Sequence, residues 1–464
     1  MKRCFQACFG LWSIGSRRKY KVPGEMQNRI VNKNKFFKVY FLVSLVVLSY
    51  FWGVLTIEFK IFPYPLFDRA YSSFRELRKV DKEKDVNPFI FDTKRRGRNV
   101  TIYDHALSSD GNVFMTLLKD GRFGGLLVNR EGEELFRWRI GYSDVWPHAA
   151  HLEYQAPDAR ISIHGASLYP NGDLLFNFDD GNFPTGSGLV KIDKCSHLLW
   201  SLAENTHHSV FRDDDGYIWV TSHVFHRNDN NGFHFIRAPY HEDFVLKLSE
   251  DGKVLDRISV IETLYKSGLE GLMRFRNRWV IEKNHEPLHL NNVDILPRQW
   301  ADKFPLFNAG DIMISMRNIN TIAVLDKDSK LIKWWMSGAF SNQHDPDFLP
   351  NGHILVFDNR WHRRRVGGSR IIEIDPISRK IVWKYSGDRA HPFYTEIRGM
   401  QQPLPNDNVL ITESEGGRAF EVTRKGKIVW EYINGLEEEG KVGVVTQADR
   451  IPVGFEQFLG QSCS

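Results

Sequence analysis

The chain has 464 residues, of which 42% are hydrophobic and 13% aromatic, and its formal net charge is +5. This length suits one large domain with appendages, and the aromatic content suits packing between sheets. The mild charge comes mostly from the N-terminal end, and we expect no nucleic-acid partner. The four cysteines include no Cys-x-x-Cys pair, so no zinc ribbon is indicated.

The N-terminal end has the pattern of a signal anchor. Residues 1–38 contain ten Lys or Arg and the single acid Glu25, and residues 39–57 carry no charge. Nineteen helical residues are long enough to cross a bilayer core of about 30 Å. The basic flank predicts a cytoplasmic segment over 1–38, a transmembrane helix over 39–57, and everything later on the far side. In a bacterium this means a single-pass inner-membrane protein with a periplasmic domain. The alternative, a buried core helix, is less favoured because the run is uncharged and its edges are aromatic.

Residues 58–98 are polar and charged, and we interpret them as a stalk or helical linker. Residues 99–464 remain for the main domain. Within it, residues 433–464 form either a tail or a last strand that closes the domain. Cys195 and Cys463 fall on the outer side, where they can pair and tie the tail to the second repeat.

One stretch of the main domain, residues 343–385, predicts four short strands. HDPDFL and HILVFD flank an Asn-Gly turn, a basic loop follows, and RIIEID and IVWKY complete the set. The pattern recurs six times, in copies that begin near Asp104, His164, His208, His289, Gln343 and Met400. Such repeats predict an all-β fold, a six-bladed β-propeller around a central channel. A β-sandwich or a β-solenoid is the alternative.

Histidines recur at one repeat position. His164, His208 and His344 each lie seven residues before a turn at the start of a first strand, and His289 is a fourth candidate. First strands line the channel of a propeller, so these side chains are expected to converge on its axis. A lone histidine is more often structural, but a repeated one favours a site.

Loops after the second strands should reach the same rim. They bring further basic candidates for substrate binding or catalysis: His223, His226, Arg317, Arg360, His362, Arg363, Arg364, Arg365 and Arg370. Imidazoles and guanidiniums together suit a tetrahedral oxyanion such as a sulfate or phosphate ester. The alternative for the arginine run is a solvated charged loop.

The segments HDPDFLPNGHILVFDN, SRIIEIDP and LPNDNVLITESEGGRAFEVTRKGKIVWEY resemble the arylsulfotransferase family, over residues 164–432. The resemblance implies a six-bladed propeller that moves a sulfuryl group from an aryl sulfate to a phenol through a sulfohistidine, with no nucleotide donor, no cofactor and no metal. It implies channel histidines at His208 and His344 and an anion-binding arginine at Arg363, with Arg360 next. The family's nucleophile lies near the last blade, where this chain has Gly399, Met400 and Gln401, so His391 or His344 is expected to serve.

The predicted mechanism has a neutral His344 attack sulfur while Arg363 and His208 stabilise the developing charge. With an ordinary histidine pKa near 6.5, activity is expected to fall below about pH 6. Two rival classes remain. One is a membrane-tethered propeller that binds an anionic ligand or a partner protein without catalysis. The other is a quinone-dependent dehydrogenase, which needs calcium ligands and an eight-blade pattern.

Overall fold

A computed structural model of the chain describes residues 24–59, 62–63, 66, 87–149, 151, 157–179, 186–228, 233, 236, 238–275, 285–360 and 368–463. The chain divides into two compact units, Met1–Val86 and Asn87–Ser464. The predicted linker helix around residues 72–85 lies outside the described residues.

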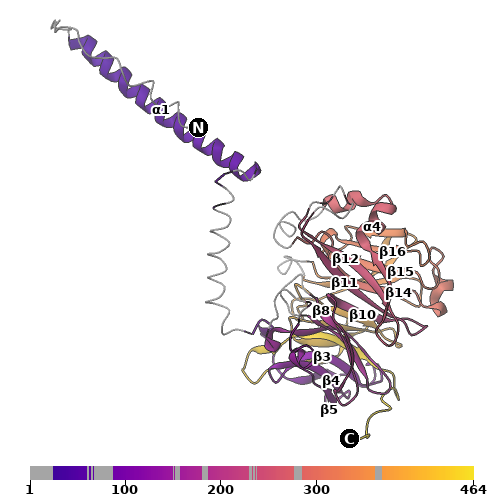
Figure 1. Cartoon of the computed structure of the whole chain (residues 1–464). Coiled ribbons are helices and arrows are strands. Elements are labelled where there is room, and N and C mark those ends of the chain that lie inside the picture. The colour runs from indigo at the N-terminus through magenta and orange to yellow at the C-terminus, as the bar shows by residue number, and fades with distance from the viewer. Residues whose placement is uncertain are drawn as a thin grey trace. The chain divides into compact units, whose positions relative to one another are not determined.

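In the first unit, the helix α1 spans Gly24–Phe59 (Figure 1). Its segment Lys35–Thr56 is a candidate membrane span with a mean hydropathy of 2.0. Its large apolar side chains, such as Leu42 and Val46, are exposed. The helix contains all of the predicted span of residues 39–57, and the candidate segment begins four residues before that span and ends one residue before its end.

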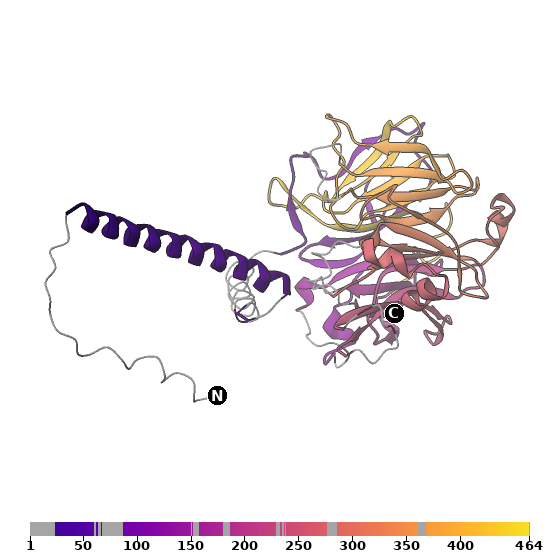
Figure 2. The ribbon, with the colours of Figure 1, turned by 90° about the horizontal axis from the view of Figure 1, so that it is seen from above.

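The second unit is the predicted six-bladed propeller (Figures 1 and 2). Each blade is an antiparallel sheet, and its strands are given below in order from the innermost to the outermost. Blade 1 is β27 (Val445–Arg450), β3 (Val113–Lys119), β4 (Arg122–Val128) and β5 (Glu134–Trp138). Blade 2 is β6 (Ser162–Leu168), β7 (Leu174–Asp179), β8 (Gly186–Ile192) and β9 (Leu198–Leu202). Blade 3 is β10 (Thr206–Arg212), β11 (Ile218–His226), β12 (Tyr240–Leu248) and β13 (Val254–Ser259).

The remaining blades follow the same order. Blade 4 is β14 (Leu290–Ile295), β15 (Ile312–Met316), β16 (Thr321–Leu325) and β17 (Ile332–Ser337). Blade 5 is β18 (His344–Phe348), β19 (Ile354–Asp358), β20 (Arg370–Asp375) and β21 (Lys380–Ser386). Blade 6 is β22 (Met400–Pro403), β23 (Val409–Glu413), β24 (Arg418–Val422), β25 (Ile428–Ile433) and a fifth, outer strand β2 (Asn99–Tyr103).

Short helical elements lie between the blades and, for η3 and η4, between strands of blade 4. They are α3 (Tyr142–Val145), α4 (Val260–Lys266) and the 3-10 turns η1 (Asp158–Arg160), η2 (Glu270–Phe275), η3 (Arg298–Lys303) and η4 (Arg317–Ile319). A two-stranded sheet pairs β1 (Ile90–Asp92) with β26 (Lys441–Gly443). The segment 87–98, expected as the end of the linker, therefore belongs to the propeller unit.

Segments from both ends of the propeller unit close the ring of blades. The first repeat was predicted to begin with a strand near Asp104, but residues 104–112 form turns, and the C-terminal strand β27 supplies the inner strand of blade 1. This is the closing strand that the sequence left as an alternative to a tail. In turn, β2 pairs with β25 and extends blade 6. Figure 1 shows yellow C-terminal chain beside the violet strands β3, β4 and β5 of blade 1.

Tryptophans on outer strands hold neighbouring blades together. Four indole N–H groups each donate to a backbone carbonyl in a turn of the next blade, in the pairs Trp138–Gly172, Trp334–Pro376, Trp383–Arg424 and Trp430–Arg130, over 2.8 to 3.0 Å. The indole fills the space between two sheets and satisfies a turn carbonyl with the same side chain. In these four blades, the Trp near the end of the predicted repeat is thus a residue that joins blades.

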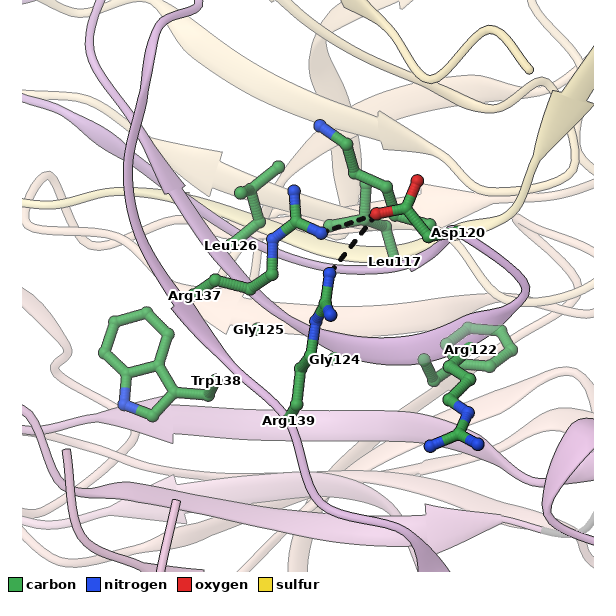
Figure 3. A pocket seen from close by; sticks show the side chains of 11 residues that line it. Leu117, Asp120, Arg122, Gly124, Gly125, Leu126, Arg137, Trp138 and Arg139 are labelled. Atoms are coloured by element: carbon green, nitrogen blue, oxygen red, sulfur yellow. Dashed lines mark hydrogen bonds and ion pairs between the residues drawn. The ribbon is translucent and has the colours of Figure 1, made fainter. Parts of the chain in front are cut away.

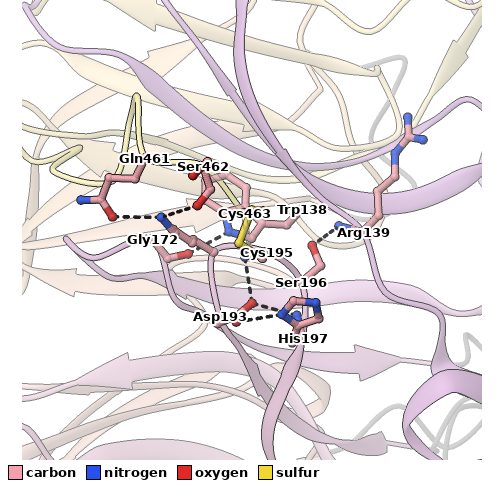
Figure 4. The surroundings of a disulfide bond; sticks show 11 residues. Trp138, Arg139, Gly172, Asp193, Cys195, Ser196, His197, Gln461, Ser462 and Cys463 are labelled. Carbon is pink, nitrogen blue, oxygen red and sulfur yellow. Dashed lines mark hydrogen bonds and ion pairs between the residues drawn. A yellow bond between two sulfur atoms is a disulfide. The ribbon is translucent and has the colours of Figure 1, made fainter.

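The C-terminal tail is held by a disulfide between Cys195 and Cys463 (Figure 4). Phe458 packs against Trp138 and Phe136 of blade 1, and Lys194 of blade 2 donates to Gln461. The tail therefore contacts the first two blades, and the disulfide, which the sequence left as a possibility, ties it to the second.

Candidate active site

Four imidazoles meet where the inner strands of blades 2 to 5 begin. His164 lies in β6, His208 in β10, His344 opens β18, and His289 directly precedes β14. The ring centroid of His208 is 4.6 Å from that of His164, 4.9 Å from that of His289 and 6.5 Å from that of His344. All four side chains are buried. The four histidines that the repeat singled out converge, with His208 at their centre.

Bulges in the inner strands make this convergence possible. Pairing of β6, β10, β14 and β18 with their neighbours shifts register within or next to the histidine position. A bulge redirects a side chain relative to the regular pleat. In β6 the bulge contains Gly165, at φ +80°, and a Cβ there would lie 1.8 Å from the backbone oxygen of His208. Only glycine lets blades 2 and 3 approach this closely beside the histidines.

The protonation of His344 follows from Asn359, which comes directly after β19. The Asn359 amide nitrogen donates to the backbone oxygens of Thr395 and Arg398, at 3.2 and 2.7 Å. Its Oδ1 therefore faces Nδ1 of His344, at 2.7 Å. An amide oxygen only accepts, so Nδ1 of His344 carries the proton and Nε2 has an available lone pair.

Two buried arginines flank the imidazoles. Arg317 begins η4, after the second strand of blade 4, and its charge acts on both His289 and His344. Arg398 comes just before β22 of blade 6, and its charge acts on His164. Guanidiniums on two sides of the cluster suit an anionic group such as a sulfate ester.

The imidazoles are neutral at pH 7. Burial, followed by the charge of Arg317, lowers the pKa of His344 to about 3. Burial also lowers the pKa of His208 and of His289 well below the usual value, and the neighbouring imidazoles add to the effect at His208. Neutral imidazoles can act as nucleophiles or exchange protons without a metal.

A family model for arylsulfotransferases (ASST) matches residues 165–435. The chain belongs to the arylsulfotransferase family. The match covers nearly all of blades 2 to 6 and includes His208, His289 and His344, and His164 lies one residue before it. It agrees with the resemblance seen in the sequence.

The chain is also similar to solved structures, at low identity and low TM-score. A protein of unknown function from Bacteroides caccae is 12% identical, with a TM-score of 0.47, over 73% of this chain and 98% of its own. Virginiamycin B lyase from Staphylococcus aureus is 12% identical, with a TM-score of 0.33, over 59% of this chain and 71% of its own. No curated protein matches the chain.

The other candidate residues of this arylsulfotransferase-family chain join the cluster, lie outside the described residues, or bind partners elsewhere. His223 joins the cluster, because its ring lies 5.2 Å from that of His207, the neighbour of His208. Arg317 also belongs to the cluster, because its charge acts on His289 and His344. Arg363, predicted to bind the anion, lies outside the described residues, as do His362, Arg364 and Arg365.

Four other candidates have different partners. Arg370 binds Asp358 at 2.6 Å and the backbone oxygen of Ala339. His226 binds Glu242 at 2.7 Å. The backbone N–H of Arg360 donates to the backbone oxygen of Ser341. His391 is not brought to the cluster: its side chain is 57% exposed and pairs with Asp388 in the same loop.

Sequence reasoning missed three residues that complete the site: Asn359, Arg398 and Glu286. Asn359 ends the run HILVFDN, where a polar residue directly after a second strand was a usable signal. Arg398 directly precedes Gly399 in the segment where the family has its histidine, and its positive charge was a usable signal. Glu286 binds Nδ1 of His289 at 2.9 Å, and its spacing of three residues from His289 carries no motif.

Two hollows lie outside the imidazole cluster. One, with about 350 Å³ of free space, is lined by residues of blade 1, where Arg137 and Arg139 both bind Asp120 (Figure 3). Asp120 therefore neutralises part of the positive charge of this hollow. The other, with about 650 Å³, includes His223, Asn205 and Arg257 and therefore borders the cluster through His223. Within the described ranges, no group of three or more His, Cys, Asp or Glu is placed to hold a metal ion.

A second polar group lies on the inner strands. Asp294 of β14, Asp345 and Asp347 of β18 and Asp449 of β27 are buried, or nearly so, and act on one another electrostatically. Burial raises the pKa of Asp345 to about 8 and that of Asp294 to about 7. Gln401 binds both Asp345, through its backbone N–H at 2.9 Å, and Asp347, through its amide at 2.7 Å. These carboxyls are stabilised in their protonated form.

Proposed function

We propose that the chain is a membrane-anchored sulfotransferase that moves a sulfuryl group from an aryl sulfate to a phenolic acceptor through His344, without a nucleotide donor. One observation carries the proposal: Asn359 directs the proton of His344 to Nδ1, so Nε2 is a neutral nucleophile inside a cluster that contains two guanidiniums. Family membership supports the same chemistry.

In the first half-reaction, Nε2 of His344 attacks the sulfur of the aryl sulfate. The N–S bond forms, the S–O ester bond breaks, and the departing phenolate takes a proton from a neighbouring imidazole. In the second half-reaction, an acceptor phenol gives its proton to that imidazole and attacks sulfur, and the N–S bond breaks. Arg317 and Arg398 are positioned to stabilise charge on the sulfuryl oxygens. No proton is gained or lost overall.

The proposed location is a bacterial inner membrane, with the propeller on the periplasmic side. The apolar segment Lys35–Thr56 and the basic residues before it support the anchor and its orientation. The Cys195–Cys463 disulfide supports the periplasmic side, because disulfides persist in oxidising compartments.

The test uses the full chain in detergent, with 4-nitrophenyl sulfate as donor and phenol as acceptor, and follows nitrophenolate release. We expect release that requires phenol and is lost in His344→Gln. His197→Gln is the matched control, because the His197 side chain is 69% exposed and pairs only locally with Asp193. Release by His344→Gln at the wild-type rate would overturn the role of His344.

A second candidate function is binding of an anionic ligand or partner without catalysis. It is favoured by Arg398, which stands beside His164 at the start of blade 6, where a histidine is expected in the family. A folded wild-type chain that binds 4-nitrophenyl sulfate in calorimetry, but releases no nitrophenolate with any phenol, would support this function instead.

A further inference from the structure

Residues 87–98, called the strap below, form the start of the propeller unit and directly follow the linker in the sequence. The backbone of the strap is fixed on the propeller. Strand β1 pairs with β26, the Val444 N–H donates to the Phe89 carbonyl at 3.0 Å, and the Thr93 N–H donates to the Gly440 carbonyl at 2.8 Å. The side chains of the strap therefore project from a backbone that the sheet holds in place.

One strap side chain, Phe89, lies against a guanidinium of the candidate site. The guanidinium carbon of Arg398 is 5.5 Å from the centroid of the Phe89 ring. Phe89 is held in turn by Phe123, whose ring meets it edge-on with centroids 4.8 Å apart. The negative face of an aromatic ring attracts a cation, more strongly when both are desolvated, and here Phe89 is 3% and Arg398 8% exposed. The Phe89 ring therefore fixes where the Arg398 guanidinium lies.

Arg398 itself has an unused donor. Among the described residues, its Nε is buried and has no hydrogen-bond partner. A buried donor without a partner is costly, so binding of an anionic oxygen at this guanidinium would remove a penalty as well as add an attraction. The orientation that Phe89 imposes on Arg398 therefore matters most when an anion is bound.

A second strap side chain, Arg95, holds the start of the segment 392–398, which carries Arg398. The Arg95 guanidinium donates to the Pro392 carbonyl at 2.7 Å and lies 2.9 Å from both carboxylate oxygens of Glu413. Oε1 of Glu413 accepts from the Tyr394 N–H at 3.0 Å. Arg95 thus fixes this segment directly and through Glu413.

The same segment supports the proposed nucleophile. The backbone oxygens of Thr395 and Arg398 accept from the Asn359 amide, and this pair of bonds turns Asn359 Oδ1 toward His344. The strap therefore reaches the site by two routes. One runs from Phe89 to the Arg398 guanidinium, and the other runs from Arg95 through the backbone to Asn359.

We propose that the strap is a positioning element for the sulfotransferase function proposed above, on which this role rests. Phe89 orients the guanidinium of Arg398 toward the sulfuryl oxygens, and Arg95 fixes the segment on which Arg398 and the acceptors of Asn359 lie. Neither strap residue touches the substrate. The segment by which the propeller is tethered to the linker is therefore also part of the support of its site.

Closure of the ring of blades does not depend on these two side chains. The ring is completed by β27 in blade 1 and by β2 in blade 6, through backbone pairing. On its outer side the strap meets solvent, since the side chain of Asp92, which pairs with Lys441 at 2.7 Å, is 88% exposed. Mild replacements of Phe89 and Arg95 are therefore expected to leave the propeller folded and to change the site.

The first test replaces Phe89 by leucine, which keeps an apolar side chain against Phe123 but removes the aromatic face. We expect kcat for 4-nitrophenyl sulfate with phenol to fall about tenfold with little change in KM, because Arg398 acts on charge that develops in the transition state. Phe89→Tyr keeps the face and should recover most of this loss. Phe91→Leu is the matched control, since Phe91 lies in the same strand and packs on the blade 1 core.

A double-mutant cycle separates positioning from a general structural role. When Arg398→Gln is already present, Phe89→Leu should cause no further loss of kcat, because Phe89 acts through the guanidinium that is gone. The same tenfold loss in both backgrounds would overturn the proposal. So would an equal loss in Phe91→Leu.

Arg95→Gln tests the second route. It should lower kcat less than Phe89→Leu does, because Arg418 still donates to the Pro392 carbonyl and to Glu413. Arg96→Gln is the matched control, since the neighbouring Arg96 side chain is exposed. A kcat of Arg95→Gln equal to that of Arg96→Gln would remove Arg95 from the positioning role.

A final readout does not depend on turnover. Orthovanadate, an oxyanion that imitates a sulfuryl group during transfer, should bind Phe89→Leu about tenfold more weakly than wild type in calorimetry, and Phe91→Leu as tightly as wild type. If wild type transfers no sulfuryl group from any aryl sulfate, the proposed function fails, and weaker orthovanadate binding by Phe89→Leu would still support the positioning of Arg398. If wild type is active and Phe89→Leu keeps both kcat and orthovanadate affinity, the role of the strap fails alone.

Discussion

Asn359 and His344 form a hydrogen bond of 2.7 Å whose direction is fixed, because the same amide donates to the backbone oxygens of Thr395 and Arg398. The bond therefore decides which nitrogen of His344 is available to a substrate. It also ties the inner strand of blade 5 to the segment that carries Arg398.

Replacing Asn359 by leucine should lower kcat/KM for sulfuryl transfer by about 10²-fold, because the favoured tautomer of His344 is lost. The measurement is nitrophenolate release per folded molecule, with the folded fraction taken from circular dichroism. Asn171→Ala, in an exposed turn of blade 2, is the control and should keep wild-type activity. Wild-type kcat/KM in Asn359→Leu would contradict the assigned tautomer.

The pH profile should differ from the one that the sequence predicts. An ordinary histidine pKa predicts a loss of activity below about pH 6. Burial and Arg317 instead lower the pKa of His344 to about 3, so this imidazole stays neutral through pH 5. We expect kcat/KM to change little between pH 7 and pH 5 while the protein remains folded. A tenfold fall over that range, with unchanged circular dichroism, would contradict a neutral, buried nucleophile.

Removing either arginine should weaken transition-state stabilisation. Arg317→Gln and Arg398→Gln are each expected to lower kcat by about 10²-fold to 10³-fold, because each removes a positive charge from a buried site where anionic oxygens develop charge. Steady-state kinetics with 4-nitrophenyl sulfate measures this. Arg379→Gln is the control, since Arg379 donates to the backbone oxygen of Trp335 and lies over the ring of Trp334, both on the outer strand β17 of blade 4. Unchanged kcat in both channel variants would remove the arginines from the mechanism.

The sequence was sufficient for the repeat, the blade count and the converging histidines, because strand alternation and turn residues are local signals. It did not predict that β27 completes blade 1, since a C-terminal strand and its partner strand β3 are more than 300 residues apart and share no local pattern. Asn359 and Glu286 were missed for a related reason. Their roles depend on which hydrogen-bond partners the fold brings to them, and their residue types alone are compatible with many environments.

The buried carboxyls predict a distinct pH dependence of stability. The pKa of Asp345 is raised to about 8 by burial and by neighbouring acids, against an ordinary value near 4. In the window between these values the folded state binds more protons than the unfolded state, so the contribution of Asp345 to stability is present below pH 4 and is lost as pH rises through 8.

Asp345→Asn removes this titration and keeps an oxygen that can accept from the backbone N–H of Gln401. We expect the variant to be more stable than wild type at pH 8.5, by on the order of 1 to 3 kcal/mol, and to gain much less at pH 5. Urea unfolding at both pH values measures the difference. A difference of the same size at both values would show that Asp345 does not titrate in this window.

The strand β27 and the tail that follows it should contribute separately to the stability of the propeller. Deleting residues 444–464 removes β27, leaves blade 1 without its inner strand and opens the ring, so we expect no cooperatively folded propeller. Deleting residues 453–464 keeps β27 but removes Phe458 and the disulfide, so we expect a folded, less stable protein.

Cys463→Ser should lower the free energy of unfolding by about 2 to 4 kcal/mol under oxidising conditions. The control is wild type in dithiothreitol, which should match the variant. Equal stability of oxidised and reduced wild type would mean that the disulfide does not constrain the unfolded chain and that the packing of Phe458 holds the tail.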